Sequence, residues 1–230
     1  LARTRFTPWY LHSAGHANSV YGDGVLSEEP PAGEPIDRFD YDPAYPVPTV
    51  GGVHSLGYMV QNFPDPIYVG PVDQRTIERR DDVLVYTSEP LEEPIEVSGF
   101  VDAVLKVSSS ARDTDFAVKL VDVAPDGTAW IIGDTMQRAR YRDSYTQPEL
   151  MQPGQVYTLK PTPITTSIRF DKGHRIRVEV TSSNFPKFAR NLNTGGPNET
   201  ESEPVVANNA VHHSVDALSY IELPVVRGQD

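Results

Sequence analysis

The chain has 230 residues, with 32 acidic and 20 basic side chains and a formal net charge of −12. This acidic balance argues against a nucleic-acid partner, because binding a phosphate backbone needs clustered lysine and arginine. The 21 prolines argue against a mostly helical protein, since a proline inside a helix breaks it. The apolar runs are too short for a membrane span or for the core of a signal peptide.

Cysteine is absent from the sequence. This excludes a disulfide scaffold, a thiolate zinc site and a cysteine nucleophile. It does not determine the cellular compartment, although a cytoplasmic location is slightly favoured.

The chain opens at Leu1 in a segment that reads as a strand and then leaves the strand pattern. Residues 27–48 are rich in proline and charge, and residues 49–80 read as loop. Prolines in such a run favour an extended backbone that finds its contacts on a surface. We therefore expect residues 27–80 to form a long excursion that packs on another domain.

Strand signals dominate the rest of the chain. In the segment HRIRVEV (174–180), branched apolar residues alternate with Arg175, Arg177 and Glu179. A period of two predicts a strand with one face in the core and one face in water. The other candidate strands are residues 83–86, 101–107, 116–123, 129–132, 156–159, 164–170 and 218–226.

Turn residues separate these strands. The segment PDG at 125–127 predicts a hairpin between its flanking strands, because Asp-Gly readily adopts the left-handed conformations of a tight turn. The segment DKG at 171–173 predicts the same between residues 164–170 and 174–180. Strands at this spacing, joined by glycine and proline turns, predict an all-β, two-sheet sandwich that forms a single domain over residues 1–230.

Signals of hydrolytic chemistry are missing. The sequence has no Gly-x-Ser-x-Gly motif, which marks the nucleophile of an α/β-hydrolase. Its histidines lack the spacing of a zinc helix, and the adjacent His212 and His213 would face opposite sides of a strand. We expect the histidines to be structural or exposed.

Asp113 and Asp115 are the best metal candidates, since two carboxylates at the entrance of a strand could bind calcium. The alternative is structural: Asp113 caps a turn and Asp115 pairs with Arg138 or Arg140. We favour the alternative, because calcium needs six to eight oxygen ligands and only two are visible.

Trp130 follows the predicted hairpin turn. If exposed, it would offer a stacking platform for a sugar ring. Packing at the edge of the sheet is the favoured interpretation, given the area that an aromatic side chain buries.

Many segments together resemble one family. In order along the chain they are YLHSAGHANS (10–19), GDGVLS (22–27), YDPAYPVPTVGG (41–52), ERRDDVLVYTSEPL (78–91), DTDF (113–116), KLVDV (119–123), RARYR (138–142), GHRIRVEV (173–180), TSSNFP (181–186) and RNLNTG (190–195). With these segments the chain resembles the C-terminal domain of the CocE/NonD hydrolases, relatives of X-Pro dipeptidyl-peptidases, α-amino-acid ester hydrolases and glutaryl acylases. The resemblance covers nearly the whole chain.

The resemblance implies a galactose-binding-like jelly roll with little helix, which follows an α/β-hydrolase domain. The family's members are serine hydrolases of esters or amides, and their Ser-His-Asp triad lies in that preceding domain. No position of this chain matches the nucleophile motif, so we assign no catalytic residue here and expect no cofactor. The implied partner is the hydrolase domain of the same parent protein, whose active-site cleft this domain would support and partly wall. We expect neither a nucleic acid nor a membrane as partner, and a homo-oligomer stays open.

Residues 41–52 are apolar without a partner pattern inside the sandwich, and we expect them to face the hydrolase domain together with residues 184–195. The candidate interface residues are Tyr41, Tyr45, Val47, Asn184, Phe185 and Asn193.

Two other hypotheses stay open. A carbohydrate-binding module would show a row of coplanar exposed aromatic rings, because fold alone does not decide function. A complete small enzyme would show a serine within hydrogen-bond reach of a histidine that a carboxylate orients.

Overall fold

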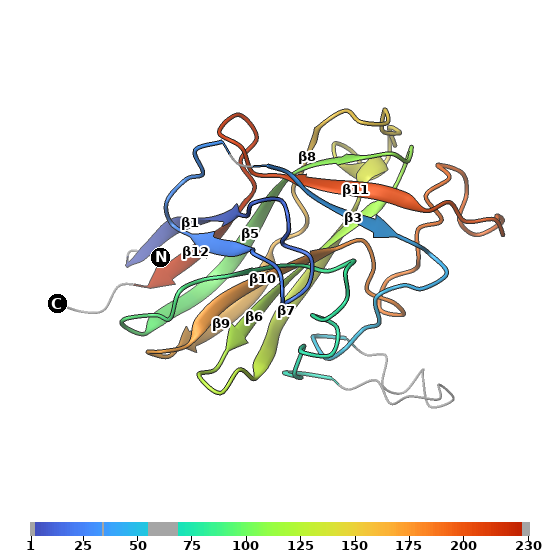
Figure 1. Ribbon diagram of the computed structural model, residues 1–230. Helices are drawn as coiled ribbons and strands as arrows, with labels where there is room; N and C mark the ends of the chain where they lie inside the picture. Colours follow the sequence, from blue (N-terminus) through green and yellow to red (C-terminus); the bar gives the residue numbers. More distant parts are fainter. Residues whose placement is uncertain (1–2, 34, 55–68, 227–230) are drawn as a thin grey trace.

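A computed structural model describes residues 3–33, 35–54 and 69–226 (Figure 1). Its strands are β1 (Thr4–His12), β2 (Val25–Ser27), β3 (Asp37–Tyr41), β4 (Leu84–Thr87), β5 (Ile95–Ser109), β6 (Asp115–Val123), β7 (Ala129–Arg138), β8 (Tyr157–Leu159), β9 (Ile164–Phe170), β10 (Arg175–Thr181), β11 (Ala207–His212) and β12 (Tyr220–Val226). A short 3-10 helix, η2 (Ala139–Tyr141), follows β7. In the described part of the chain, no helix is long and apolar enough to cross a bilayer.

The strands form one hydrogen-bonded path in the order β3-β11-β5-β12-β1-β2-β4-β10-β6-β7, with β8 and β9 also paired to β5. The two ends of this path face each other across one core. Phe39 of β3 and Phe116 of β6 meet edge to face, with ring centroids 6.4 Å apart. The core draws apolar residues from both halves, including Val101 and Leu105 of β5 and Leu120 of β6.

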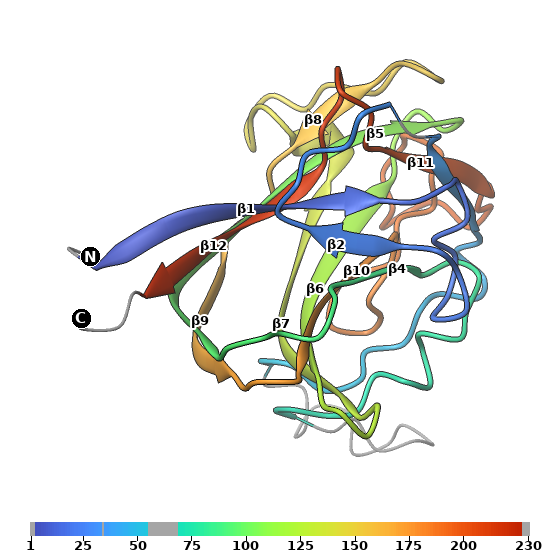
Figure 2. The ribbon, with the colours of Figure 1, turned by 60° about the vertical axis from the view of Figure 1, so that its left-hand side comes forward.

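This arrangement confirms the predicted all-β class and is consistent with a sandwich. The jelly-roll and galactose-binding-like connection stays a prediction. β1 pairs with β12 antiparallel, Thr4 opposite Val226, so the two ends of the described chain lie side by side (Figure 2).

The first predicted hairpin is confirmed, because β6 and β7 pair on either side of residues 125–127. Gly127 adopts a φ of 86°, and Asp126 accepts a hydrogen bond from the Thr128 backbone N–H at 2.9 Å. The second predicted hairpin is wrong. β9 pairs with β5, whereas β10 pairs with β4 and β6, so residues 171–173 connect strands that are not neighbours.

The prediction for the polar face of β10 is also wrong. Arg177 and Glu179 are buried, and so is Lys119 on the neighbouring strand β6. Residues 74–83 of the same chain cover this face, with Gln74, Ile77 and Glu78 all buried. The two-residue alternation was predicted correctly. The polar face, however, is covered by residues 74–83 instead of being exposed to water.

Part of the predicted excursion belongs to the sheet itself. β3 lies within residues 27–80 and pairs with β11, which the sequence pattern also missed. The alternation in β3 was hidden because the buried position at its start is Asp37 rather than an apolar residue. Residues 55–68 lie outside the described residues, so the expectation for that part of the excursion stays a prediction.

Candidate functional site

Two loops far apart in the sequence are joined into one surface. We call residues 42–49 and 183–190 the loop platform. The Phe185 N–H donates to the Val47 carbonyl at 2.9 Å, and the Thr49 N–H donates to the Phe185 carbonyl at 2.6 Å. The Val47 N–H donates to Ser183 Oγ at 2.8 Å. The structure thus brings together parts of the two segments expected to face a missing domain.

The six candidate interface residues divide into two groups. Tyr45 is 74 % exposed, and Phe185 is half-buried. The side chains of Tyr41, Val47, Asn184 and Asn193 are buried within this chain. Tyr41 ends β3 and faces the main core, and Val47 packs with a smaller cluster that includes Val83 and Val85. The four buried side chains lie beneath the platform, whereas the side chains of Tyr45 and Phe185 reach its surface.

Two arginines hold the backbone around Tyr45. Arg80 Nη2 donates to the Tyr45 carbonyl at 2.6 Å, and Arg190 Nη1 donates to the Pro43 carbonyl at 2.8 Å. The Arg190 guanidinium also lies over the Phe185 ring, 5.6 Å from its centroid. The main chain is therefore fixed from two sides, and the Tyr45 ring is left in solvent.

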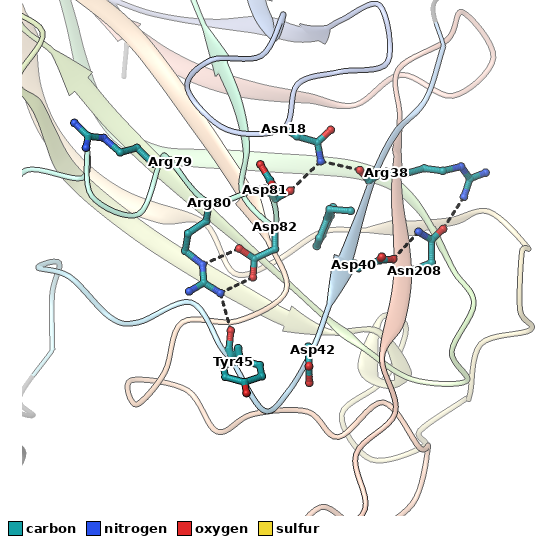
Figure 3. Close-up of a pocket in the computed structure, with 11 residues that line it drawn as sticks. Asn18, Arg38, Asp40, Asp42, Tyr45, Arg79, Arg80, Asp81, Asp82 and Asn208 are labelled. Carbon is teal, nitrogen blue, oxygen red and sulfur yellow. Dashed lines mark hydrogen bonds and ion pairs between the residues drawn. The ribbon is translucent and has the colours of Figure 1, made fainter.

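A groove of about 580 Å³ runs beside the platform, between β3 and residues 79–82 (Figure 3). Arg80 pairs with both carboxylate oxygens of Asp82 at 2.7 Å each. Arg38 and Arg79 also line the groove, and Arg38 Nη1 donates to Asn208 Oδ1 at 3.2 Å. Within the described ranges no ion pair engages the three remaining carboxylates that line the groove, Asp40, Asp42 and Asp81.

Asp115 pairs with an arginine as the structural alternative expected, whereas Asp113 pairs with Arg140 instead of capping a turn. Asp113 accepts bonds from the backbone N–H and Nε of Arg140, at 3.0 and 2.7 Å. Arg138 Nε donates to Asp115 at 3.1 Å, and Asn191 Nδ2 donates to both carboxylates. Burial raises the pKa of Asp115 to about 6, although Arg138 and Asn191 favour its charged form. Over the described residues, no group of three or more His, Asp or Glu side chains could hold a metal ion.

A buried serine, histidine and aspartate meet at the start of β3. Ser13 Oγ donates to Asp37 at 2.7 Å, and His213 Nε2 lies 2.9 Å from Asp37 and 3.2 Å from Ser13 Oγ. A carboxylate only accepts hydrogen bonds, so Nε2 carries its proton toward Asp37 and does not take one from the serine. A catalytic histidine uses its two ring nitrogens for the acid and the serine, whereas here one nitrogen contacts both.

This cluster is a structural node. Tyr86 Oη and the Ala17 N–H also donate to Asp37, at 2.8 and 2.9 Å, and the aspartate and histidine are fully buried. Burial opposes ionisation, but the hydrogen bonds from His213, Ala17, Ser13 and Tyr86 outweigh it and lower the pKa of Asp37. The arrangement does not supply the site that a complete small enzyme needs.

The sequence analysis missed a second buried polar cluster, on the covered face of β10. Lys119 Nζ lies 3.5 Å from Glu179, and Arg177 Nη1 lies 2.7 Å from Glu78. Gln74 Oε1 accepts a bond from Lys119 at 3.2 Å. Burial raises the pKa of Glu179 to about 7 despite Lys119, and the nearby carboxyl of Glu78 adds to the rise.

Trp130 lies on β7, the last strand of the path, and is 41 % exposed. In the described segments, however, the ring contacts involve none of Trp130, Tyr21 and Tyr45. Tyr145 stacks on Tyr141 with centroids 6.4 Å apart, which is a single pair. These observations show no row of rings of the kind a carbohydrate-binding face would use.

Comparison with known proteins decides the family. Residues 1–222 match the family described as the X-Pro dipeptidyl-peptidase C-terminal non-catalytic domain. The chain belongs to this family. It is 45 % identical to cocaine esterase of Rhodococcus sp. (strain MB1 Bresler), over 99 % of this chain and 38 % of that protein. The resemblance found from the motifs is thereby confirmed.

Solved structures agree with this assignment. An α-amino acid ester hydrolase superposes with a TM-score of 0.81 at 31 % identity, over 96 % of this chain and 36 % of that one. An aminopeptidase from the marine sediment archaeon Thaumarchaeota archaeon superposes with a TM-score of 0.82 at 30 % identity, over 97 % and 37 %. The chain is thus a non-catalytic C-terminal domain of the CocE/NonD type and spans less than two fifths of these relatives.

Proposed function

We propose that this chain is the accessory domain of a serine hydrolase of esters or amides. In the parent it supports a preceding α/β-hydrolase domain and forms part of the wall of the active-site cleft. One observation carries the proposal: 99 % of the chain aligns with cocaine esterase but spans only 38 % of that protein. The other relatives named above are an ester hydrolase and an aminopeptidase, so the parent's reaction belongs to the same broad class.

The described side chains support an accessory role. The cluster of Ser13, His213 and Asp37 is buried. His213 Nε2 carries a proton toward Asp37, so it does not take the proton of Ser13 as nucleophilic catalysis requires. The loop platform, in contrast, presents an exposed aromatic ring on a fixed backbone, which suits contact with another domain.

The test uses protein from the native source. A fluorophosphonate, which reacts with activated serines, labels the extract, and intact mass identifies the species that carries this sequence. We expect a labelled species far heavier than the 25.5 kDa of this chain. An unlabelled species of 25.5 kDa would contradict the proposal.

A further inference from the structure

A second groove, of about 680 Å³, lies over β5, β8 and β12. Strand register places two unlike pairs of residues along it. Lys106 of β5 stands opposite Thr158 of β8, and Val104 of β5 stands opposite Tyr220 of β12. Val104 and Lys106 are two positions apart on one strand, so they share a face of the sheet. The groove therefore has a basic end next to an apolar end, and its volume suits a small molecule.

The basic end is held in place before any ligand arrives. Lys106 Nζ donates to Thr158 Oγ1 at 2.7 Å, so the ammonium group is fixed beside a hydroxyl. Lys160, two positions after Thr158, also lines the groove, and its backbone N–H donates to Gln137 Oε1 at 2.9 Å. Within the described ranges, neither lysine takes part in an ion pair. Both positive charges are thus available to a ligand.

The third cation of the groove is already neutralised. Arg142 pairs with Asp143 at 3.2 Å and with Glu149 at 3.3 Å, and its guanidinium lies 4.4 Å from the centroid of the Tyr157 ring. Among the lining residues that the structure describes, the two lysines then face one further carboxylate, the exposed Asp216. A local excess of positive charge on a chain of net charge −12 favours an anion at this place.

The apolar end determines what else the anion must carry. Val104, Leu218 and Tyr220 line it and are half-buried, and Val215 beside them is 61 % exposed. The Tyr220 ring is held by Tyr10, with centroids 5.6 Å apart. An inorganic anion would leave this surface in water, whereas an acyl chain would cover it and gain the free energy of apolar burial.

We propose that this groove binds a small organic carboxylate with an apolar chain. The carboxylate accepts charge-assisted bonds from Lys106 and Lys160, and the Thr158 hydroxyl, whose oxygen already accepts from Lys106, donates its own proton. The chain lies along Val104 and Tyr220. The inference goes beyond the proposed function and rests on it only for the origin of the ligand, because hydrolysis of an ester or amide releases a carboxylate.

The test is calorimetric titration of the intact parent with hexanoate, after a fluorophosphonate has blocked its active serine. Hexanamide has nearly the same shape without the charge, and acetate has the charge without the chain. We expect saturable binding of hexanoate, and binding about tenfold weaker for each of the other two, because one lacks the charge-assisted bonds and the other the apolar contact.

Two variants locate the binding on the molecule. Lys106→Met and Lys160→Met keep the length of the side chain and remove its charge, and we expect each to weaken hexanoate binding about tenfold. Lys160 is exposed, so its replacement tests the site without disturbing the fold. The matched control is Lys172→Met, an exposed lysine outside the groove, which should leave the affinity unchanged.

The outcomes separate this inference from the proposed function. A labelled parent that shows no saturable hexanoate binding, or binds it equally well in both groove variants, would overturn the inference alone. Tighter, lysine-dependent binding of tetraglutamate would assign the groove to an acidic polypeptide and would also overturn it. A parent that takes no label but binds hexanoate through the two lysines would contradict the proposed function and support the groove as a carboxylate site.

Discussion

Asp37 shows how one residue can hold several elements. It accepts bonds from Tyr86 on β4 and from groups in the connections that follow β1 and β11, all away from water. An asparagine there would place an amide N–H₂ against donors such as Ser13 Oγ and His213 Nε2. We expect Asp37→Asn to lower the free energy of unfolding by about 3 kcal/mol, since a broken buried network leaves its partners unsatisfied.

The matched control for Asp37 is Asp40→Asn, on the exposed side of the same strand, and we expect it to change stability little. Chemical denaturation at neutral pH measures both. Because the pKa of Asp37 is lowered in the folded state, its contribution is present above its unfolded pKa and fades as pH falls below it. Equal stabilities of the two variants would contradict the role assigned to Asp37.

Glu179 predicts the opposite dependence on pH. Its folded pKa of about 7 lies above its ordinary value of 4.5, so between these values the folded state holds a proton that the unfolded state releases. Stability from this group therefore falls as pH rises, by at most about 1.4 kcal/mol for each pH unit. Buried Asp115, with a pKa raised to about 6, acts in the same direction.

The change that isolates Glu179 is Glu179→Gln, which removes its titration and keeps its shape. We expect the free energy of unfolding of the variant, measured between pH 5 and 7.5, to decline less steeply with pH than that of the unmutated chain. Parallel curves for the two proteins would show that Glu179 does not hold the proton.

Contacts between residues near each other in the sequence could be predicted, and contacts between distant residues could not. The sequence offered Arg138 and Arg140 as partners of Asp115, and the structure pairs Asp115 with Arg138. Ser13 and His213 are separated by 200 positions, so no local pattern links them. Lys119, Glu78 and Glu179 read as residues of solvated segments, because nothing in a two-residue period tells which loop covers a face.

At the scale of the strands, Gly133 sets the distance between β7 and β9. A Cβ at this position would clash with Cγ2 of Ile164, a branched side chain buried in β9. We expect Gly133→Ala to destabilise the fold by about 1–3 kcal/mol through overpacking.

A double-mutant cycle with Ile164→Ala checks the cause. Removing the clashing methyl should make the second alanine less harmful, which gives a coupling energy between the two sites in thermal or chemical unfolding. Additive effects would show that Gly133 is needed for another reason.

Strand positions were predicted better than strand partners. Most segments with strand signals are strands, and β9 has the predicted bounds. The hairpin expected at residues 171–173 failed because turn residues specify that the chain reverses, and not which strand it joins. β10 is buried on both faces, so it takes a position between β4 and β6, whereas β9 keeps exposed positions and pairs with β5.

For the whole molecule, the loop platform predicts an effect outside this chain. In the parent, Tyr45→Ala should weaken the contact between the domains by on the order of 2 kcal/mol, as truncation of a central interface anchor does. The expected readout is a lower temperature of thermal inactivation of the hydrolase activity. Tyr145→Ala, of equal exposure, should leave that temperature unchanged, and equal losses would contradict the prediction.

The sequence by itself determined the fold class, the lack of a nucleophile motif and the family, because strand period, turn residues and motif order are all local properties of the chain. Only the tertiary structure decided that residues 74–83 cover β10, that Tyr41 and Val47 are buried, and that Tyr45 is presented on two joined loops. These facts depend on contacts between segments that are far apart in the sequence, such as residues 42–49 and 183–190. Such contacts form where burial and hydrogen bonding are best satisfied over the whole chain. A local sequence pattern does not specify which distant segments will meet.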